Sequence, residues 1–106
     1  MIQEFGVKNF YSIKNEQKIS FVPTPDGTQA ENYLHEVTSG VNLLKIGIIY
    51  GSNASGKSNV LMALDFFHDL MLSVPQDKMS RIEGYAPFLL DDTSRSETCQ
   101  MRLVFW

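Results

Sequence analysis

One stretch of the sequence constrains the fold more than any other, because it joins a β-branched run to a glycine-rich turn and then to a helical pattern. Residues 46–50 read Ile-Gly-Ile-Ile-Tyr, and residues 51–58 read Gly-Ser-Asn-Ala-Ser-Gly-Lys-Ser. The second stretch matches G-x-x-x-x-G-K-[ST], which marks a phosphate-binding loop when a strand precedes it and a helix follows it. The sequence therefore predicts a P-loop in a strand-loop-helix unit, rather than a plain Gly/Ser turn.

Each residue type in this loop suits a bound triphosphate. Gly51 and Gly56 lack a Cβ, so successive backbone N–H groups can turn inward and form an anion-binding nest. The helix that begins near Lys57 adds its N-terminal N–H groups and the positive end of its dipole. The Lys57 ammonium can reach the β- and γ-phosphates, and the Ser58 hydroxyl can ligate Mg²⁺. The predicted phosphate-binding residues are Gly51, Ser52, Asn53, Ala54, Ser55, Gly56, Lys57, Ser58 and Asn59.

Length and composition limit the possible classes of protein. A chain of 106 residues makes one domain at most. Its net charge of -3 predicts no general affinity for nucleic acid or for acidic membranes, although a local basic patch stays possible. Its apolar runs fall far short of the roughly 20 residues that span a bilayer, and its N-terminus lacks the layout of a signal peptide. We expect a cytoplasmic protein, in which the single Cys99 is a small core residue.

The rest of the chain falls into segments around the P-loop unit. Residues 2–7 and 18–22 alternate in a strand-like way and predict a strand pair with its turn at Asn15-Glu16. Proline, aspartate and glycine then predict an exposed loop, with a short strand over 33–37. We predict a single nucleotide-binding domain over 1–106: a strand pair over 1–22, a loop over 23–40, the strand-loop-helix unit over 41–74, and a loop with a C-terminal strand over 75–106.

The P-loop strand and helix have distinct patterns. The run 41–50 has few polar positions near its end, which predicts a central strand covered on both faces, with Gly47 allowing a close neighbour. The following helix is expected to pack one arc on the sheet, to leave His68 solvated, and to end at Val74-Pro75. The residues of this arc are Val60, Leu61, Leu64, Phe67 and Met71.

Asp91 and Asp92 follow the apolar residues 88–90, as the acids of a Walker B strand would. The apolar run is short, however, and Pro87 would interrupt the hydrogen bonds of a central strand. Few residues are also available for the crossover from the first helix. The sequence thus favours a surface turn with both carboxylates solvated, and the catalytic residues stay unidentified.

Three segments together resemble a known family. They are residues 5–12 (FGVKNFYS), residues 50–59 (YGSNASGKSN) and residues 87–91 (PFLLD). In these segments the chain is similar to the start of the AAA-type ATP-binding proteins related to the SMC/RecF branch of ABC ATPases, which bacteria often carry in anti-phage and abortive-infection systems. The resemblance implies an α/β fold, the N-terminal part of a P-loop NTPase with an ABC-like mixed sheet, incomplete on its own.

The resemblance also implies ligands and site residues. ATP and Mg²⁺ would bind at the P-loop, and water would be the eventual nucleophile in the complete protein. Asn9 and Ser12 match the family's N-F-x-S element beside the nucleotide. Tyr11 stands where the family often has a basic residue, so it would stack on the base or pack in the core. A C-terminal lobe would add the signature motif, the Walker B acid and the switch histidine.

Three functions stay open at this point. The first is the N-terminal part of an ATPase, which would hide a bare sheet face by associating with itself, with the rest of the ATPase or with a second subunit. The second is a non-catalytic nucleotide-binding module that a partner completes. The third is a small P-loop kinase, which the long segment before the P-loop and the absence of an arginine-rich lid disfavour. The sequence does not select a nucleic-acid or toxin partner.

Overall fold

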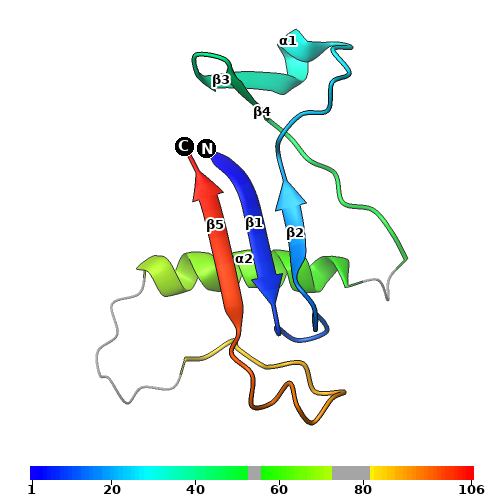
Figure 1. Ribbon diagram of the computed structural model, residues 1–106, viewed down its shortest axis with the longest axis vertical. Helices are drawn as coiled ribbons and strands as arrows, with labels where there is room; N and C mark the ends of the chain where they lie inside the picture. The colour runs from blue at the N-terminus through cyan, green and yellow to red at the C-terminus, as the bar shows by residue number, and fades with distance from the viewer. Residues whose placement is uncertain (53–55, 73–81) are drawn as a thin grey trace.

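The computed structural model describes residues 1–52, 56–72 and 82–106 (Figure 1). The helices and strands lie in a mixed order along the chain. They are β1 (Ile2–Lys8), β2 (Gln17–Ser20), α1 (Ala30–Tyr33), β3 (Leu34–Thr38), β4 (Val41–Leu44), α2 (Lys57–Leu72) and β5 (Gln100–Phe105).

The main sheet joins the two ends of the chain. Its strand order is β2-β1-β5, and both pairings are antiparallel. Phe5 of β1 lies opposite Ile19 of β2 on one side and opposite Leu103 of β5 on the other. The predicted N-terminal strand pair and the predicted C-terminal strand are therefore confirmed. Figure 1 shows α2 crossing behind this sheet, so the helix that follows the P-loop covers one sheet face.

The core lies between the main sheet and α2. Its fully buried side chains come from β1, from the turn after β1, and from α2: Phe5, Val7, Phe10, Ile13 and Ala63. The Phe5 and Phe67 rings meet edge to face at 5.8 Å, and Phe10 packs on Phe66 at 5.6 Å. Burying each such phenyl ring contributes about 1.5–3 kcal/mol. Cys99 also packs against this cluster, as expected, and burial raises the pKa of its thiol.

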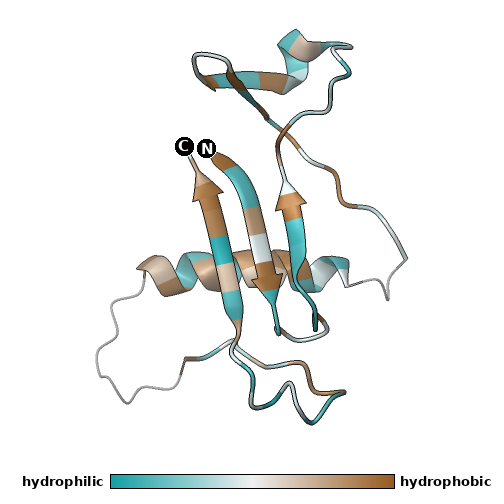
Figure 2. Ribbon diagram, in the orientation of Figure 1, coloured by the Kyte–Doolittle hydropathy of each residue, from teal (hydrophilic) through white to brown (hydrophobic). Residues whose placement is uncertain are grey.

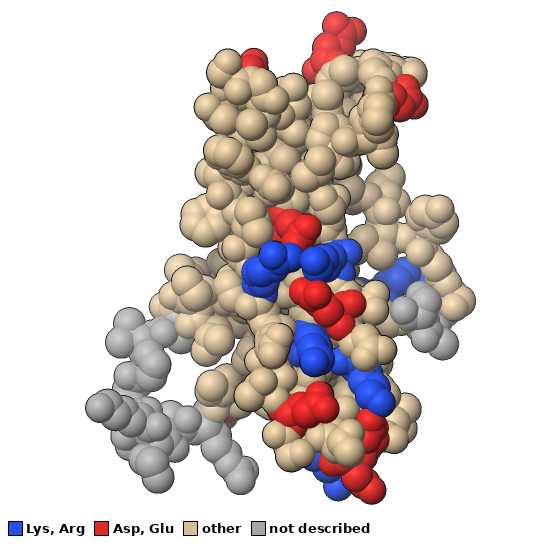
Figure 3. Space-filling model, in the orientation of Figure 1, with Lys and Arg blue, Asp and Glu red and all other residues tan. Residues whose placement is uncertain are grey.

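The other face of the main sheet is polar. Glu4 of β1 pairs with Arg102 of β5, and the Lys18 ammonium of β2 lies 4.0 Å from the same carboxylate. Lys18 also lies 3.9 Å from Glu16. Figure 3 shows acidic and basic side chains alternating over this face. This bare face of the sheet is therefore charged, so it gives no apolar reason for the predicted association.

The turn after β1 is tighter than the sequence suggested. Phe10 and Ile13 exchange two backbone hydrogen bonds, of 2.9 and 2.8 Å, so the chain reverses at Tyr11-Ser12. The predicted turn at Asn15-Glu16 is wrong, because burial of Phe10 and Ile13 fixes the reversal earlier. Asn9 and Tyr11 both have positive φ, at 55° and 49°. Asparagine tolerates this conformation better than most residues, which suits it to the start of the turn.

A second, two-stranded sheet is formed by β3 and β4. Their antiparallel hairpin turns at Ser39-Gly40, where Gly40 has φ +78° and its N–H donates to Glu36 Oε1 at 3.1 Å. The short strand predicted over 33–37 is thus confirmed within one residue. The single turn of α1 lies in the segment that we predicted to be a loop.

The segment before the P-loop differs most from our prediction. Strand β4 ends at Leu44, and residues 46–50 form no strand. Ile48 is 82% exposed and Tyr50 is 90% exposed, so the predicted central strand over 41–50, covered on both faces, is wrong in this structure. The described strands pair with one another, in the order β2-β1-β5 and as β3-β4, and none of them pairs with this run. Figure 2 shows the apolar residues along the trace between β4 and α2.

Two smaller expectations concern Gly47 and the end of α2. A Cβ at Gly47 would lie 3.3 Å from the Phe21 ring, which confirms that this glycine allows a close neighbour. Helix α2 runs to Leu72, and its predicted end at Val74-Pro75 lies outside the described residues. Within the described part of the chain, no helix is long and apolar enough to cross a membrane.

Candidate functional site

The P-loop lysine folds back over its own loop. Lys57 is the first residue of α2, and its ammonium donates to the carbonyl oxygen of Ser52 at 3.1 Å and to that of Gly51. The ends of the loop are therefore held together around one positive charge. Asn53, Ala54 and Ser55 of the predicted phosphate-binding set lie outside the described residues.

Gly56 forms the junction between the loop and α2. Its φ is +82°, a left-handed conformation that suits glycine and strains other residues. Its carbonyl oxygen accepts the N–H groups of Asn59 at 3.1 Å and Val60 at 3.3 Å. Ser58 lies exposed in the first turn of α2, which contains no acidic side chain. The helix dipole and Lys57 therefore make this end of α2 a favourable environment for an anion.

Asn9 and Ser12 both match the family's N-F-x-S pattern, and Ser12 is the one that lies beside the start of α2. Ser12 is exposed, and its Oγ accepts a hydrogen bond from Asn59 Nδ2. The same oxygen lies 3.4 Å from the position of a Cβ at Gly56. The structure thus brings Ser12, Gly56 and Asn59 close together.

Asn9 has a different environment from Ser12. It is 1% exposed, and its Nδ2 donates to the carbonyl oxygens of Ser94 at 2.8 Å and Glu97 at 2.9 Å. Its Oδ1 accepts the N–H of Phe88 at 2.9 Å. Both ends of this amide are therefore occupied inside the protein, and Asn9 does not face the loop. We had predicted that Asn9 flanks the nucleotide, but in this structure it joins the N-terminal turn to residues 88–97.

Tyr11 lies at the edge of the core. Its ring is partly buried and packs on Phe10 with centroids 4.8 Å apart. Its N–H donates to the carbonyl oxygen of Ala86 at 2.8 Å. Of the two roles considered for Tyr11, the structure shows core packing.

Asp91 and Asp92 lie in a series of turns after residue 90, with no strand before them. Asp91 forms an ion pair with Lys14 and accepts hydrogen bonds from the N–H of Thr93 at 2.9 Å and from its hydroxyl at 2.7 Å. Leu90 beside them is 90% exposed. The prediction of a surface turn instead of a Walker B strand is confirmed, although Asp91 is paired and only Asp92 is freely exposed.

The hydrogen-bonded Lys14 ammonium, helped by Thr93, lowers the pKa of Asp91 to about 2. Because the folded protein holds the carboxylate ionised, the pair contributes stability above the ordinary value of 3.8, and this contribution is lost as pH falls through about 2. We predict that Lys14→Met raises the pKa of Asp91 part of the way towards 3.8, since the Thr93 hydrogen bonds remain. An NMR titration of the Asp91 carboxyl group checks this. Lys45→Met, at an exposed bend, is the control and should leave the Asp91 titration unchanged.

The histidine and metal-ligand expectations concern other parts of the surface. His68 is exposed on α2, with Nδ1 3.3 Å from the Asp69 carboxylate, which agrees with a solvated side chain. Across residues 1–52, 56–72 and 82–106, no group of three or more His, Cys, Asp or Glu side chains is placed to hold a metal ion. A magnesium ion at the P-loop would instead use Ser58 together with phosphate and water oxygens.

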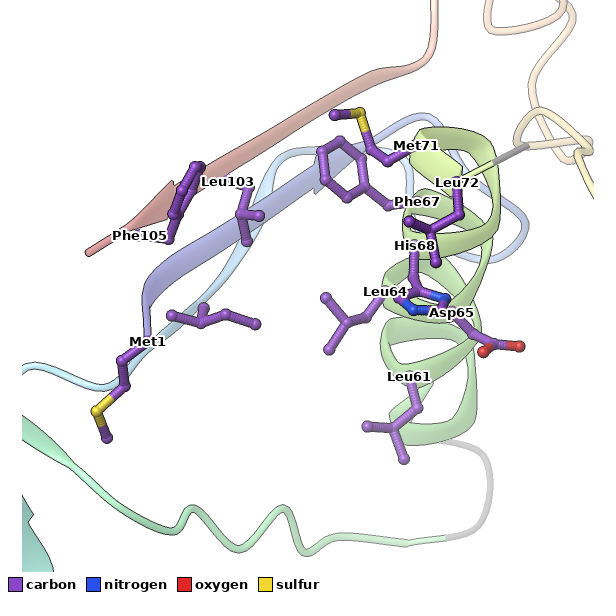
Figure 4. Close-up of a pocket in the computed structure, with 11 residues that line it drawn as sticks. Met1, Leu61, Leu64, Asp65, Phe67, His68, Met71, Leu72, Leu103 and Phe105 are labelled. Atoms are coloured by element: carbon purple, nitrogen blue, oxygen red, sulfur yellow. The ribbon is translucent and has the colours of Figure 1, made fainter. Parts of the chain in front are cut away.

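Sequence reasoning missed an apolar groove of about 840 Å³ between α2 and the ends of β1 and β5 (Figure 4). Leu61 and Met71, expected to pack on the sheet, line this groove and are 55% and 68% exposed. Ala63 is the buried residue of α2 instead. The apolar arc of α2 is therefore wider than its contact with the sheet, a difference that helical periodicity alone does not reveal.

Comparison of the chain with protein-family models, with curated proteins and with solved structures gives no match. Any function for this chain therefore has to be argued from its own residues and their geometry. The two strongest observations are the P-loop sequence over 51–58 and the way in which Lys57 closes that loop.

Proposed function

We propose that this chain binds Mg-ATP through its P-loop, as the nucleotide-binding part of an ATPase. The observation that carries the proposal is the match of residues 51–58 to G-x-x-x-x-G-K-[ST] directly before α2, with the Lys57 ammonium turned towards the loop carbonyls. The positive φ of Gly56 supports it, because a glycine is needed where the loop enters the helix.

The chain's own groups have separate tasks in this proposal. Lys57 exchanges its carbonyl partners, Gly51 and Ser52, for phosphate oxygens, which compensate its charge better than neutral carbonyl groups do. The N–H groups at the start of α2 add hydrogen bonds to the same anion. Ser58 supplies one oxygen ligand to the magnesium ion that neutralises the β- and γ-phosphates.

Hydrolysis is assigned in this proposal to the complete ATPase. Asp91 is held by Lys14 and Thr93, and we therefore do not assign it as the water-orienting carboxylate. We expect the isolated chain to turn over ATP far more slowly than the roughly 1–10³ s⁻¹ of a working enzyme. The resemblance to SMC/RecF-like proteins suggests a cytoplasmic ATPase with a possible role in DNA-linked or anti-phage processes.

Exposed apolar surface supports association with another chain or with the rest of the ATPase. Ile46, Ile48 and Tyr50 are 58%, 82% and 90% exposed, and the last two line a hollow beside β2 that is separate from the apolar groove along α2. Contiguous apolar surface of this kind is usually covered in a working assembly. The occupied state of Asp91 also favours the second candidate function, a non-catalytic nucleotide-binding module that a partner completes.

A magnesium-dependent variant tests the proposed site. We predict that Ser58→Ala weakens ATP binding roughly tenfold with Mg²⁺ present, because the hydroxyl acts through the metal. In EDTA the variant and the wild type should bind with nearly equal affinity. Calorimetric titrations with and without Mg²⁺ measure both numbers, and Ser39→Ala in the distant β3-β4 turn is the matched control. An equal loss in EDTA argues against the metal role.

A further inference from the structure

The turn after β1 lies against the first turn of α2, although the two are far apart in sequence. Ser12 Oγ accepts a hydrogen bond from Asn59 Nδ2, across 47 residues of chain. A Cβ at Gly56 would lie 3.4 Å from the same oxygen, which is ordinary van der Waals contact. One exposed hydroxyl is therefore bonded to a side chain that begins the helix and lies near the glycine that ends the loop.

The turn that carries Ser12 is held by buried side chains and by hydrogen bonds. Phe10 and Ile13, on either side of the Tyr11-Ser12 turn, are 0% and 6% exposed and exchange two backbone hydrogen bonds. The Tyr11 N–H is bonded to Ala86, and Asn9 is bonded to Ser94 and Glu97. The hydroxyl is thus held in place from the core and from residues 86–97.

The other side of the contact is the helix start. The Gly56 carbonyl oxygen accepts the N–H groups of Asn59 and Val60, so the position of Asn59 and the orientation of the Gly56 peptide are linked. A residue that holds the Asn59 side chain restrains this peptide as well. The Gly56 peptide lies next to Lys57 and Ser58, whose placement decides phosphate and magnesium binding in the function proposed above.

We propose that Ser12 is a positioning residue for the phosphate-binding loop, acting through Asn59 and Gly56. The hydroxyl accepts a hydrogen bond from the Asn59 side chain, and the Asn59 N–H is bonded to the Gly56 carbonyl oxygen. The consequence for nucleotide affinity rests on the proposed function, whereas the restraint on the helix start does not. Ser12 is not assigned a contact with the nucleotide.

The restraint is tested first on the ligand-free protein, by NMR hydrogen exchange of the Asn59 and Val60 amides. Ser12→Ala is expected to speed exchange at both amides about 2- to 12-fold, the range for one hydrogen bond. Ser12→Thr keeps the hydroxyl and should restore slow exchange. The Phe5 and Val7 amides report global stability and should not change, and Ser39→Ala is the control. Unchanged exchange at Asn59 and Val60 in Ser12→Ala overturns the positioning role.

The effect on nucleotide binding is measured by a double-mutant cycle with Mg-ATP. Ser12→Ala and Asn59→Ala should each weaken binding about 2- to 12-fold, and the double variant should bind no worse than the weaker single variant. If the losses of affinity in the two single variants add up in the double variant, Ser12 does not act through Asn59. If exchange rises in Ser12→Ala but Lys57→Ala leaves the affinity for ATP unchanged, the proposed function fails and the nucleotide part of this inference fails with it.

Discussion

Replacing Lys57 by alanine is expected to weaken Mg-ATP binding about 10- to 150-fold, the equivalent of the roughly 1.5–3 kcal/mol of a charge-assisted hydrogen bond. The melting temperature of the ligand-free protein should hardly change, because the partners of the ammonium in the described part of the chain are neutral loop carbonyls at an exposed site. Isothermal titration calorimetry and a thermal melt measure the two quantities.

A matched variant separates a specific effect of Lys57 from a general loss of positive charge. Lys45→Ala removes one lysine from an exposed bend before the P-loop and should leave the affinity for Mg-ATP unchanged. If Lys57→Ala and the wild type bind with equal affinity, the P-loop interpretation is wrong. If both lysine variants lose affinity equally, the binding is nonspecific charge attraction.

Replacing Asn9 by alanine is expected to lower the free energy of unfolding by about 2–4 kcal/mol, because one buried and two part-buried hydrogen bonds lose one partner each. Ser94 is 1% exposed, so water has little access to its carbonyl oxygen and the cost of leaving that oxygen unpaired is not recovered. Alanine also adds strain, since the backbone at this position has φ 55°. Urea denaturation measures the change.

A second variant separates the loss of stability due to backbone strain from the loss due to the missing hydrogen bonds. Asn9→Gly removes the same hydrogen bonds but tolerates the positive φ, so it should be slightly more stable than Asn9→Ala and still far less stable than the wild type. Asn42→Ala, at an exposed position of β4, is the control and should change stability little. A loss below about 1 kcal/mol in Asn9→Ala contradicts the structural role assigned to this amide.

The elements that could be predicted from the sequence are those with a strong local pattern. The alternation in β1 and β5 was sufficient to place these strands within a residue or two, and the motif and helical period placed the start of α2. The turn after β1 was misplaced because Asn15-Glu16 is a good local turn signal, while the actual reversal depends on burial of Phe10 and Ile13 against α2. Local signals do not carry that information.

The run Ile46–Tyr50 illustrates another limit of pattern reasoning. Its composition fits a strand between two covering layers, but composition does not say whether those layers are present in the same chain. In the structure the described strands pair among themselves, and this run lies exposed beside β2 and the start of α2. A sequence pattern therefore identified what kind of environment the run suits, and not the environment that it has.

In the candidate site, too, some residues could be named from the sequence and others depend on the fold. Gly56, Lys57 and Ser58 could be identified from the motif alone, because their spacing is fixed by the shape of a phosphate group. The contact between Ser12 and Asn59, and the burial of Asn9, depend on how distant segments meet. Asn9 and Ser12 belong to the same short sequence pattern, yet the structure places one in the interior and the other beside the loop.

The pairing of β1 with β5 has a consequence for the order of folding. Glu4 and Arg102 bridge these strands from positions 98 residues apart, so the central strand of the main sheet acquires its second neighbour only after β5 has been synthesised. Closing a loop of that length costs about 4 kcal/mol of chain entropy beyond a constant term. Folding is therefore governed by a non-local contact and should be slow for a domain of this size. Until β5 arrives, the ribosome-bound chain carries a P-loop on a helix whose supporting sheet is still incomplete.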